Sequence, residues 1–257
     1  MNKDQQLLEE AYCRILSEET IKIPIRSREQ KEKNYVISIQ RRIQEYVKNG
    51  SKGDLRLNGT PINSLPDNLE VGGSLYLDNT PITSLPRNLK VKGTLSLTVT
   101  NVTSLPDDLK VGGSLYLASS KITSLPRNLT LVEGSLGLNS CSITSLPDNL
   151  KIIKGDLYLA CTKIASLPDE LQVQGSLDLK DTPIDSLPRN LKIGGNLDLR
   201  YTQISSLPDD LEVGGDLYLN FLLAKYVEKK DMNKKAMIFH GVSLYVPKSF
   251  KLGGEII

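Results

Sequence analysis

Side chains that commonly carry chemistry are scarce in this chain of 257 residues, which has one histidine, His240, and three cysteines, Cys13, Cys141 and Cys161. The cysteines show no spacing typical of zinc ligands, and their odd number argues against a disulfide framework. No serine or cysteine near His240 in sequence lies on a recognisable turn, so the residues indicate no nucleophile with its base. We therefore expect no enzymatic activity, no metal site and no cofactor.

Glycine pairs and lysines are the remaining candidates for ligand chemistry. The Gly-Gly pairs lack the Lys-Ser/Thr of a phosphate loop and recur regularly, which is typical of corners in a repeated fold. Several lysines between residues 225 and 235 could meet phosphate, but a solvated helix face explains them equally well, and no aromatic stacking platform accompanies them. With 32 Lys+Arg and 30 Asp+Glu the net charge is only +2. A nucleic-acid or membrane partner is therefore not expected.

Targeting signals are also missing from the sequence pattern. The first residues, MNKDQQLLEEAYCRIL, contain no uninterrupted apolar stretch followed by a small-residue cleavage site, and no run of 18 apolar residues occurs anywhere. We expect a cytoplasmic protein.

A repeat dominates the chain and must position any functional surface. The dipeptide Leu-Pro recurs every 20 or 21 residues, beginning at Leu65, Leu85, Leu105, Leu125, Leu146, Leu167, Leu187 and Leu207. The unit reads L-P-x-x-L-x-V-x-G-x-L-x-L-x-x-T-x-I-x-S, and the two 21-residue copies contain one extra residue before the glycine, in LTLVEG and LKIIKG. Such self-similarity predicts a solenoid in which each repeat stacks on the next.

The alternation within each unit predicts how the chain runs. In L-x-L the two leucines point to one side of a strand and the intervening residue to the other, so stacked strands form a parallel sheet with one buried and one displayed face. A coil of 20 residues leaves no room for a full helix, and Leu-Pro keeps the return path extended or turn-like. The repeats should therefore contain almost no helix.

The pattern L-x-L-x-x-T-x-I over about residues 53–220 resembles the leucine-rich repeat family, which has L-x-L-x-x-N-x-L. The resemblance implies an α/β-class leucine-rich repeat solenoid: a right-handed parallel β coil with little helix in its repeats, a helical amino-terminal cap and a mixed carboxyl-terminal cap. Short repeats of this kind are similar to those of secreted effectors of Gram-negative pathogens and of proteins encoded by bacteriophages. This implies a protein partner: a host enzyme or defence component that a phage protein inhibits, or partners that a bacterial effector or scaffold recruits without inhibition.

Two columns of the repeat have structural interpretations. Where the family has its asparagine ladder, this chain has mostly threonine, with Cys141 in one copy, and hydroxyls there can each bond one backbone group in the bend. We expect Cys141 to be a buried, inert thiol and Cys161 to be displayed. The residue after each Leu-Pro is charged and mostly alternates in sign, which predicts an exposed ladder that sets stacking register: Asp67, Arg87, Asp107, Arg127, Asp148, Asp169, Arg189 and Asp209.

Both ends depart from the repeat and are predicted to cap it, because a solenoid exposes apolar edges at its ends. We expect domains at 1–50 (helical cap), 51–220 (solenoid) and 221–257 (cap). The first cap is predicted to hold helices over residues 4–16 and 34–48, the second with Val36, Ile39, Ile43 and Val47 on one apolar stripe and a stop at Gly50. FLLAKYVEKKD, from residue 221, is predicted as a helix, and MIFHGVSLYV, from residue 237, as a pair of short strands.

The displayed face of the sheet is the predicted binding surface. Its columns vary freely and collect tyrosines, which are typical of interaction hot spots; the alternative is that tyrosine is there only because it suits strands. Aromatic and charged residues gather in the carboxyl-terminal half, so the predicted partner-binding residues are Tyr158, Asp178, Lys180, Asp198, Arg200, Tyr201, Tyr218 and Phe221.

Overall fold

The computed structural model describes residues 28–219 and four short stretches beyond them, 225–227, 234–239, 242–247 and 251–252. The chain divides into two compact units, Met1–Gln40 and Arg41–Ile257, and all the repeats lie in the second. The predicted helix over residues 4–16 lies outside the described residues, as do Cys13 and His240. The three predicted domain ranges remain predictions.

Helix α2 (Arg28–Lys48) begins before the predicted start at Asn34 and ends at Lys48, as predicted. Gly50 follows with a φ of 81°, and the amide of Ser51 donates to the carbonyl of Tyr46 at 3.0 Å. A glycine in the left-handed region is a common helix stop, because it lacks the Cβ that clashes there.

The buried stripe of α2 differs from the prediction in its last turn. Ile39 and Ile43 are buried, but Val47 is 47% exposed and Tyr46 is half-buried in its place. The Tyr46 hydroxyl lies within hydrogen-bond distance of the carbonyl of Gly53, at 2.8 Å, and accepts the amide of Gly72 at 3.2 Å. A phenol can satisfy polar groups at the start of the solenoid while its ring stays packed, and valine has no such group.

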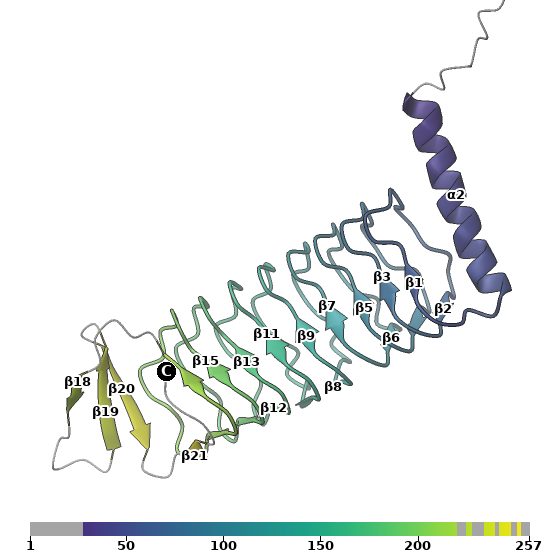
Figure 1. Cartoon of the computed structure of the whole chain (residues 1–257). Helices are drawn as coiled ribbons and strands as arrows, with labels where there is room; N and C mark the ends of the chain where they lie inside the picture. The colour runs from purple at the N-terminus through teal and green to yellow at the C-terminus, as the bar shows by residue number, and fades with distance from the viewer. Residues whose placement is uncertain (1–27, 220–224, 228–233, 240–241, 248–250, 253–257) are drawn as a thin grey trace, which may run out of the picture. The chain divides into compact units, whose positions relative to one another are not determined.

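Nine short parallel strands form the main sheet, one from each coil (Figure 1). In chain order they are β1 (Leu55–Arg56), β3 (Leu75–Tyr76), β5 (Leu95–Ser96), β7 (Leu115–Tyr116), β9 (Leu136–Gly137), β11 (Leu157–Tyr158), β13 (Leu177–Asp178), β15 (Leu197–Asp198) and β17 (Leu217–Tyr218). Each strand pairs with the equivalent residues of the next coil, so that Leu177 lies opposite Leu197. The register therefore repeats the sequence period, and the predicted parallel solenoid is confirmed.

The interior of the coils is aliphatic. Both leucines of each L-x-L motif are buried, as is the isoleucine or valine that follows the bend. Most leucines of the L-P-x-x-L segments are buried as well. No helix interrupts the described chain from residue 51 to residue 219, as the short period requires.

A second row of strands follows the turn after each Leu-Pro, and it is broken. A three-stranded sheet holds β2 (Glu70–Val71), β4 (Lys90–Val91) and β6 (Lys110–Val111). A six-stranded sheet holds β8 (Leu131–Val132), β10 (Ile152–Ile153), β12 (Gln172–Val173), β14 (Lys192–Ile193), β16 (Glu212–Val213) and β21 (Lys251–Leu252). The break between β6 and β8 falls at the first 21-residue copy.

The predicted hydroxyl ladder is present in the bend that follows the main sheet. Thr60, Thr80, Thr100, Thr162, Thr182 and Thr202 each donate the side-chain hydroxyl to the carbonyl three residues earlier, at 2.6–2.7 Å. Cys141 is buried in this ladder, where its thiol donates to the carbonyl of Leu117 at 3.0 Å. Burial raises the pKa of that thiol, whereas Cys161 is exposed, so both cysteine placements are confirmed.

A second side-chain ladder precedes the strands of the main sheet and was not predicted. Asp54 accepts the amide of Ser74 at 2.9 Å, and Ser74 accepts the amide of Thr94 at 3.1 Å. Asp156 continues the pattern by accepting the amide of Ser176 at 2.7 Å. A short polar side chain at this position bonds the next coil directly, which helps to hold the coils in register.

Beyond the repeats, the predicted helix from residue 221 is wrong for its described part, because Lys225–Val227 form strand β18. Strand β18 pairs antiparallel with β19 (Lys234–Phe239), so tertiary pairing overrides the helical pattern, and Tyr226 and Val227 are residue types that favour strands. The predicted strand pair is confirmed: β19 pairs antiparallel with β20 (Val242–Pro247).

Candidate binding face

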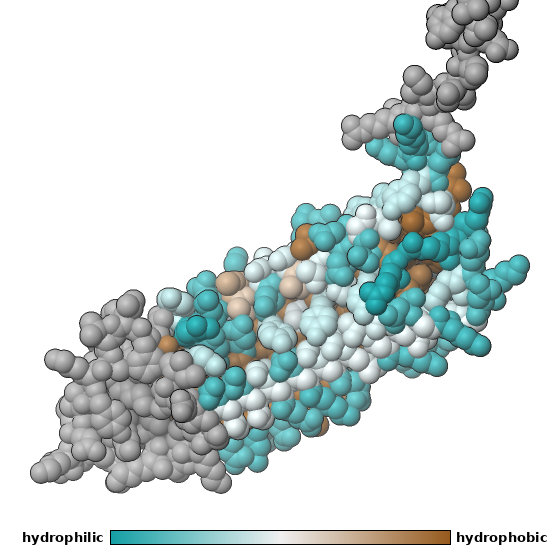
Figure 2. All heavy atoms as spheres, in the orientation of Figure 1, coloured by the Kyte–Doolittle hydropathy of each residue, from teal (hydrophilic) through white to brown (hydrophobic). Residues whose placement is uncertain are grey.

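The displayed face of the main sheet is formed by the residues between and after the paired leucines. Two of the residues predicted to be displayed are in fact buried: Ser96, which donates to the carboxylate of Asp78, and Gly137. A Cβ on Gly137 would lie 2.8 Å from the ring of Tyr116, because that ring lies over the neighbouring strand. The face of the solenoid seen in Figure 2 carries hydrophilic and hydrophobic residues next to one another.

Four predicted residues form one row across neighbouring strands. Tyr158 lies opposite Asp178, Asp178 opposite Asp198, and Asp198 opposite Tyr218. All four are half-buried. Adjacent strands are about 4.8 Å apart, so the two tyrosines stand about 14 Å from each other with both carboxylates between them.

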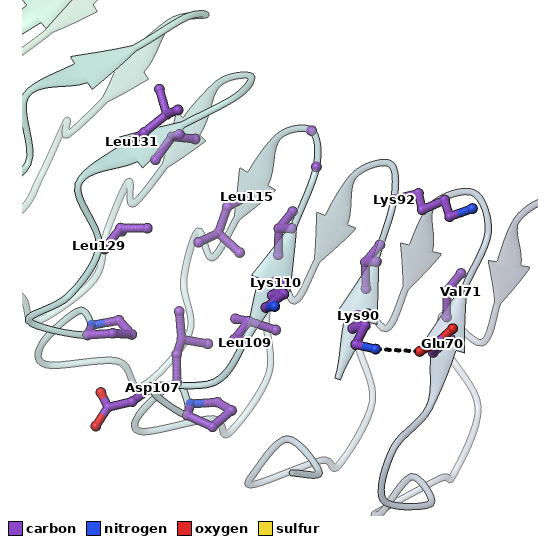
Figure 3. A pocket seen from close by; sticks show the side chains of 18 of the residues that line it. Glu70, Val71, Lys90, Lys92, Asp107, Leu109, Lys110, Leu115, Leu129 and Leu131 are labelled. Atoms are coloured by element: carbon purple, nitrogen blue, oxygen red, sulfur yellow. Dashed lines mark hydrogen bonds and ion pairs between the residues drawn. The ribbon is translucent and has the colours of Figure 1, made fainter. Parts of the chain in front are cut away.

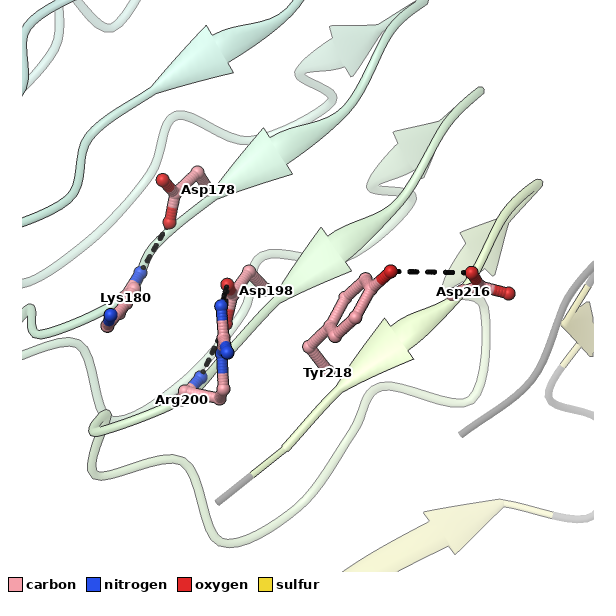
Figure 4. Close-up of polar contacts among 6 residues, drawn as sticks. All are labelled: Asp178, Lys180, Asp198, Arg200, Asp216 and Tyr218. Carbon is pink, nitrogen blue, oxygen red and sulfur yellow. Dashed lines mark hydrogen bonds and ion pairs between the residues drawn. The ribbon is translucent and has the colours of Figure 1, made fainter. Parts of the chain in front are cut away.

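Arg200, two residues after Asp198, forms an ion pair with the Asp198 carboxylate of this row (Figure 4). The Arg200 Nε donates to the two carboxylate oxygens of Asp198 at 2.9 and 3.1 Å, and a terminal nitrogen of the guanidinium donates to the same carboxylate. This hydrogen bonding raises the pKa of Arg200. The guanidinium carbon also lies 5.5 Å from the centre of the Tyr218 ring, within cation–π distance. The side chain of Arg200 is therefore held in place between an acid and an aromatic ring.

The carboxylates of Asp178 and Asp198 also accept hydrogen bonds from backbone amides just after their strands. Asp178 accepts the backbone amide of Lys180, and Asp198 that of Arg200, both at 3.0 Å. Burial raises the pKa of Asp178, and the neighbouring carboxylate of Asp198 acts in the same direction. The lysine ammonium lies 5.8 Å from the centre of the Tyr201 ring, a second cation–π contact one coil before that of Arg200.

The tyrosine hydroxyls are oriented by two acids that are not among the predicted partner-binding residues. Tyr158 donates to Asp156 at 2.8 Å, and Tyr218 donates to Asp216 at 3.5 Å. The hydrogen bond to Asp156, helped by burial, raises the pKa of Tyr158 to about 12. The sequence spacing could have identified both acids. Each acid precedes its tyrosine by two residues, and alternate residues of a strand lie on the same side.

Tyr201 is the most exposed of the predicted residues that the structure describes. It is 59% exposed and has a φ of 59°, in the left-handed region. At each described position of this column, the second residue after the second leucine, the backbone is left-handed: Gly59, Asn79, Val99, Ser119, Ser140, Cys161, Asp181 and Tyr201. Phe221, the next member of the column, lies outside the described residues. The structure thus brings together Tyr158, Asp178, Lys180, Asp198, Arg200, Tyr201 and Tyr218.

The chemistry of this face is that of recognition. The face presents tyrosine rings, a guanidinium in an ion pair, and carboxylates that are hydrogen-bonded to neighbouring residues of the same face. Among the described residues, no group of three or more His, Cys, Asp or Glu side chains could hold a metal ion. In the same part of the chain, no helix has the length and apolar character needed to cross a bilayer.

No protein-family model matches the chain. No curated protein matches it either. Among solved structures, the leucine-rich repeat domain of a Shigella effector is similar, with 22% sequence identity, a TM-score of 0.44, and coverage of 86% of this chain and 95% of that one.

Proposed function

We propose that this protein is a non-enzymatic binding module that recognises a protein partner through the face of the main sheet, centred on β11 to β17. The observation that supports the proposal most is the row from Tyr158 to Tyr218, with Arg200 held between Asp198 and the Tyr218 ring. Binding hot spots are enriched in tyrosine and arginine. A side chain already held in one conformation loses less entropy when a partner covers it.

The internal pairing of charges also suits burial under a partner. The Asp198 side chain is only 15% exposed and its partner Arg200 is 42% exposed, so covering both would desolvate an ion pair instead of a lone charge. Truncating one member would leave the other charge unpaired, which typically costs more than removing both.

Interface size predicts how far the contact extends. A standard interface buries about 800 Å² on each partner, which is a patch about 28 Å across. The four strands of the row span about 14 Å between the first and the last. We therefore propose that the partner also contacts neighbouring coils, with Tyr201 near the centre of the contact.

The experiment that tests this function is a comparative capture from lysate of the source organism or its host. The wild-type protein, the double variant Tyr218→Ala/Arg200→Ala and the control Asp169→Ala, an exposed residue of the outer charge ladder, would each be immobilised, incubated with the lysate and treated with a cross-linker. We expect the wild type and the control to retain the same protein and the double variant to lose it, with all three showing similar thermal midpoints. Retention of the same protein by the double variant would refute the proposed face.

The finer proposal is that binding blocks the partner, in the cytosol of a bacterial host, as the resemblance to bacteriophage-encoded repeat proteins implies. The alternative is a bacterial effector or scaffold that recruits partners without inhibition. Titrating the purified protein against the captured partner separates the two. A stoichiometric loss of the partner's activity supports inhibition, and full activity in the saturated complex supports recruitment.

A further inference from the structure

The second row of strands opens between β6 and β8. In every other pair of neighbouring repeats from β2 to β16, backbone amides of one coil donate to carbonyls of the previous one: Gly112 to Val91 at 2.8 Å, for example, and Lys154 to Val132 at 3.0 Å. Within the described chain, the equivalent bonds from β8 to the carbonyls of Leu109 and Val111 are absent, and the two sheets are separate. Two strand edges with unpaired backbone groups therefore face each other.

The apolar core is accessible at this opening. Leu109, Val111 and Leu129 are half-buried, whereas the equivalent residues of the coils on either side, such as Leu89 and Val91, are almost fully buried. Leu115 of the main sheet also lines the resulting cavity, which has a volume of about 560 Å³ (Figure 3). This volume lies within the range of about 300–1,000 Å³ found for ligand sites.

The surface beside the opening is apolar where the other coils are polar. The outward position of these strands holds Glu70, Lys90, Lys110, Gln172, Lys192 and Glu212 in the 20-residue copies. In the two 21-residue copies the same position holds Leu131 and Ile152. Leu131 is 37% exposed. Leu131 therefore places an aliphatic side chain on β8, the edge strand of the opening, and Ile152 lies next to it on β10.

The charge around the cavity is mainly positive. Lys90, Lys92 and Lys110 line it, and Lys90 is engaged by Glu70 at 2.5 Å (Figure 3). Asp107 is the only other acidic residue among the lining side chains of the described chain. A ligand with acidic groups would therefore complement this rim.

We infer that the opening between β6 and β8 is a second binding site, which takes an extended segment of a partner protein in which apolar residues alternate with acidic ones. Backbone groups of the segment bond the free edges of β6 and β8, as in strand addition to a sheet. Alternate apolar side chains enter the cavity, and acidic side chains on the other side meet the lysines. The site is independent of the proposed face, because it lies on the second row of strands.

The test is selection of peptides from a random dodecamer display library on the folded full-length protein. Three variants would be compared with the wild type: Leu131→Lys, which restores the polar outward position; Lys92→Glu/Lys110→Glu, which reverses the rim charge; and the control Tyr218→Ala/Arg200→Ala on the main sheet. Leu131, Lys92 and Lys110 are exposed, so these variants are expected to fold, and circular dichroism checks this.

We expect selected peptides to alternate apolar and acidic residues. The Leu131 and lysine variants should each weaken their binding at least about tenfold, while the control should leave it unchanged. N-methylation of alternate amides in a selected peptide should weaken binding similarly, because it removes backbone donors. The inference is overturned if no selected peptide depends on Leu131, if binding survives charge reversal, or if only dodecanoate, an alkyl carboxylate without backbone amides, binds.

Discussion

Replacing Thr182 with valine removes one buried hydroxyl from the threonine ladder while keeping the shape of the side chain. The Thr182 hydroxyl donates to the carbonyl of Leu179 at 2.7 Å, and the residue is 3% exposed. Within the described chain this carbonyl accepts no other hydrogen bond. In the coil before it, the carbonyl of Leu159 accepts both the hydroxyl of Thr162 at 2.7 Å and its amide at 3.2 Å.

The two sites therefore predict different losses of stability. Thr182→Val leaves a buried carbonyl unsatisfied, which costs about 1–3 kcal/mol, whereas Thr162→Val removes one of two bonds, which is worth about 1 kcal/mol. For a protein of this size, 1 kcal/mol corresponds to about 2–4 °C in the thermal midpoint. Taking the middle of the first range, about 2 kcal/mol, we expect Thr182→Val to lower the midpoint by about 4–8 °C. Thr162→Val should lower it by about 2–4 °C.

Differential scanning calorimetry of the wild type and both valine variants measures these shifts. Thr182→Ser serves as the matched control, because it keeps the hydroxyl and removes only a methyl group. The contrary result is that Thr182→Val is no more destabilising than Thr162→Val. In that case the amide bond to the Leu159 carbonyl does not compensate for the lost hydroxyl, and the reasoning about unsatisfied carbonyls in the bend is refuted.

Three further predictions concern the reactivity of two thiols, the titration of the Tyr158 phenol and the replacement of a glycine in a turn between strands. Cys141 is buried and Cys161 exposed, so maleimide should label Cys161 before Cys141 in the folded protein, and equal rates at these two thiols would contradict the assigned register. Because the pKa of Tyr158 rises from 10.0 to about 12, its contribution to stability should be complete below pH 10 and lost between pH 10 and 12. Absorbance at alkaline pH should show a late-titrating phenol in the wild type that disappears in Tyr158→Phe. Gly194→Ala should destabilise the protein by about 1–3 kcal/mol in urea unfolding, since its Cβ would lie 2.1 Å from a backbone oxygen of the previous coil, whereas Gly59→Asn should change stability by less than about 0.5 kcal/mol.

Much of the solenoid followed from the sequence because its interactions repeat at a fixed spacing. Paired leucines in L-x-L specify which face is buried, and each coil meets only its neighbours, so one register applied to every copy predicts the whole sheet. The same reasoning placed Cys141 inside and Cys161 outside, and it collected the residues from Tyr158 to Tyr218 on one face.

Only the tertiary structure shows the features that arise where two neighbouring repeats differ in length or in side chains. The 21-residue copies showed an insertion, but only the folded coils show that the sheet opens between β6 and β8, at the first of these copies, and that the core around Leu109 is accessible there. Likewise, the sequence placed Arg200 near Tyr218 without showing that the guanidinium is held by Asp198 and lies over the ring. The physical reason is that a repeated pattern specifies average positions, whereas hydrogen bonds and cavities depend on the side chains and backbone spacing of each particular pair of coils.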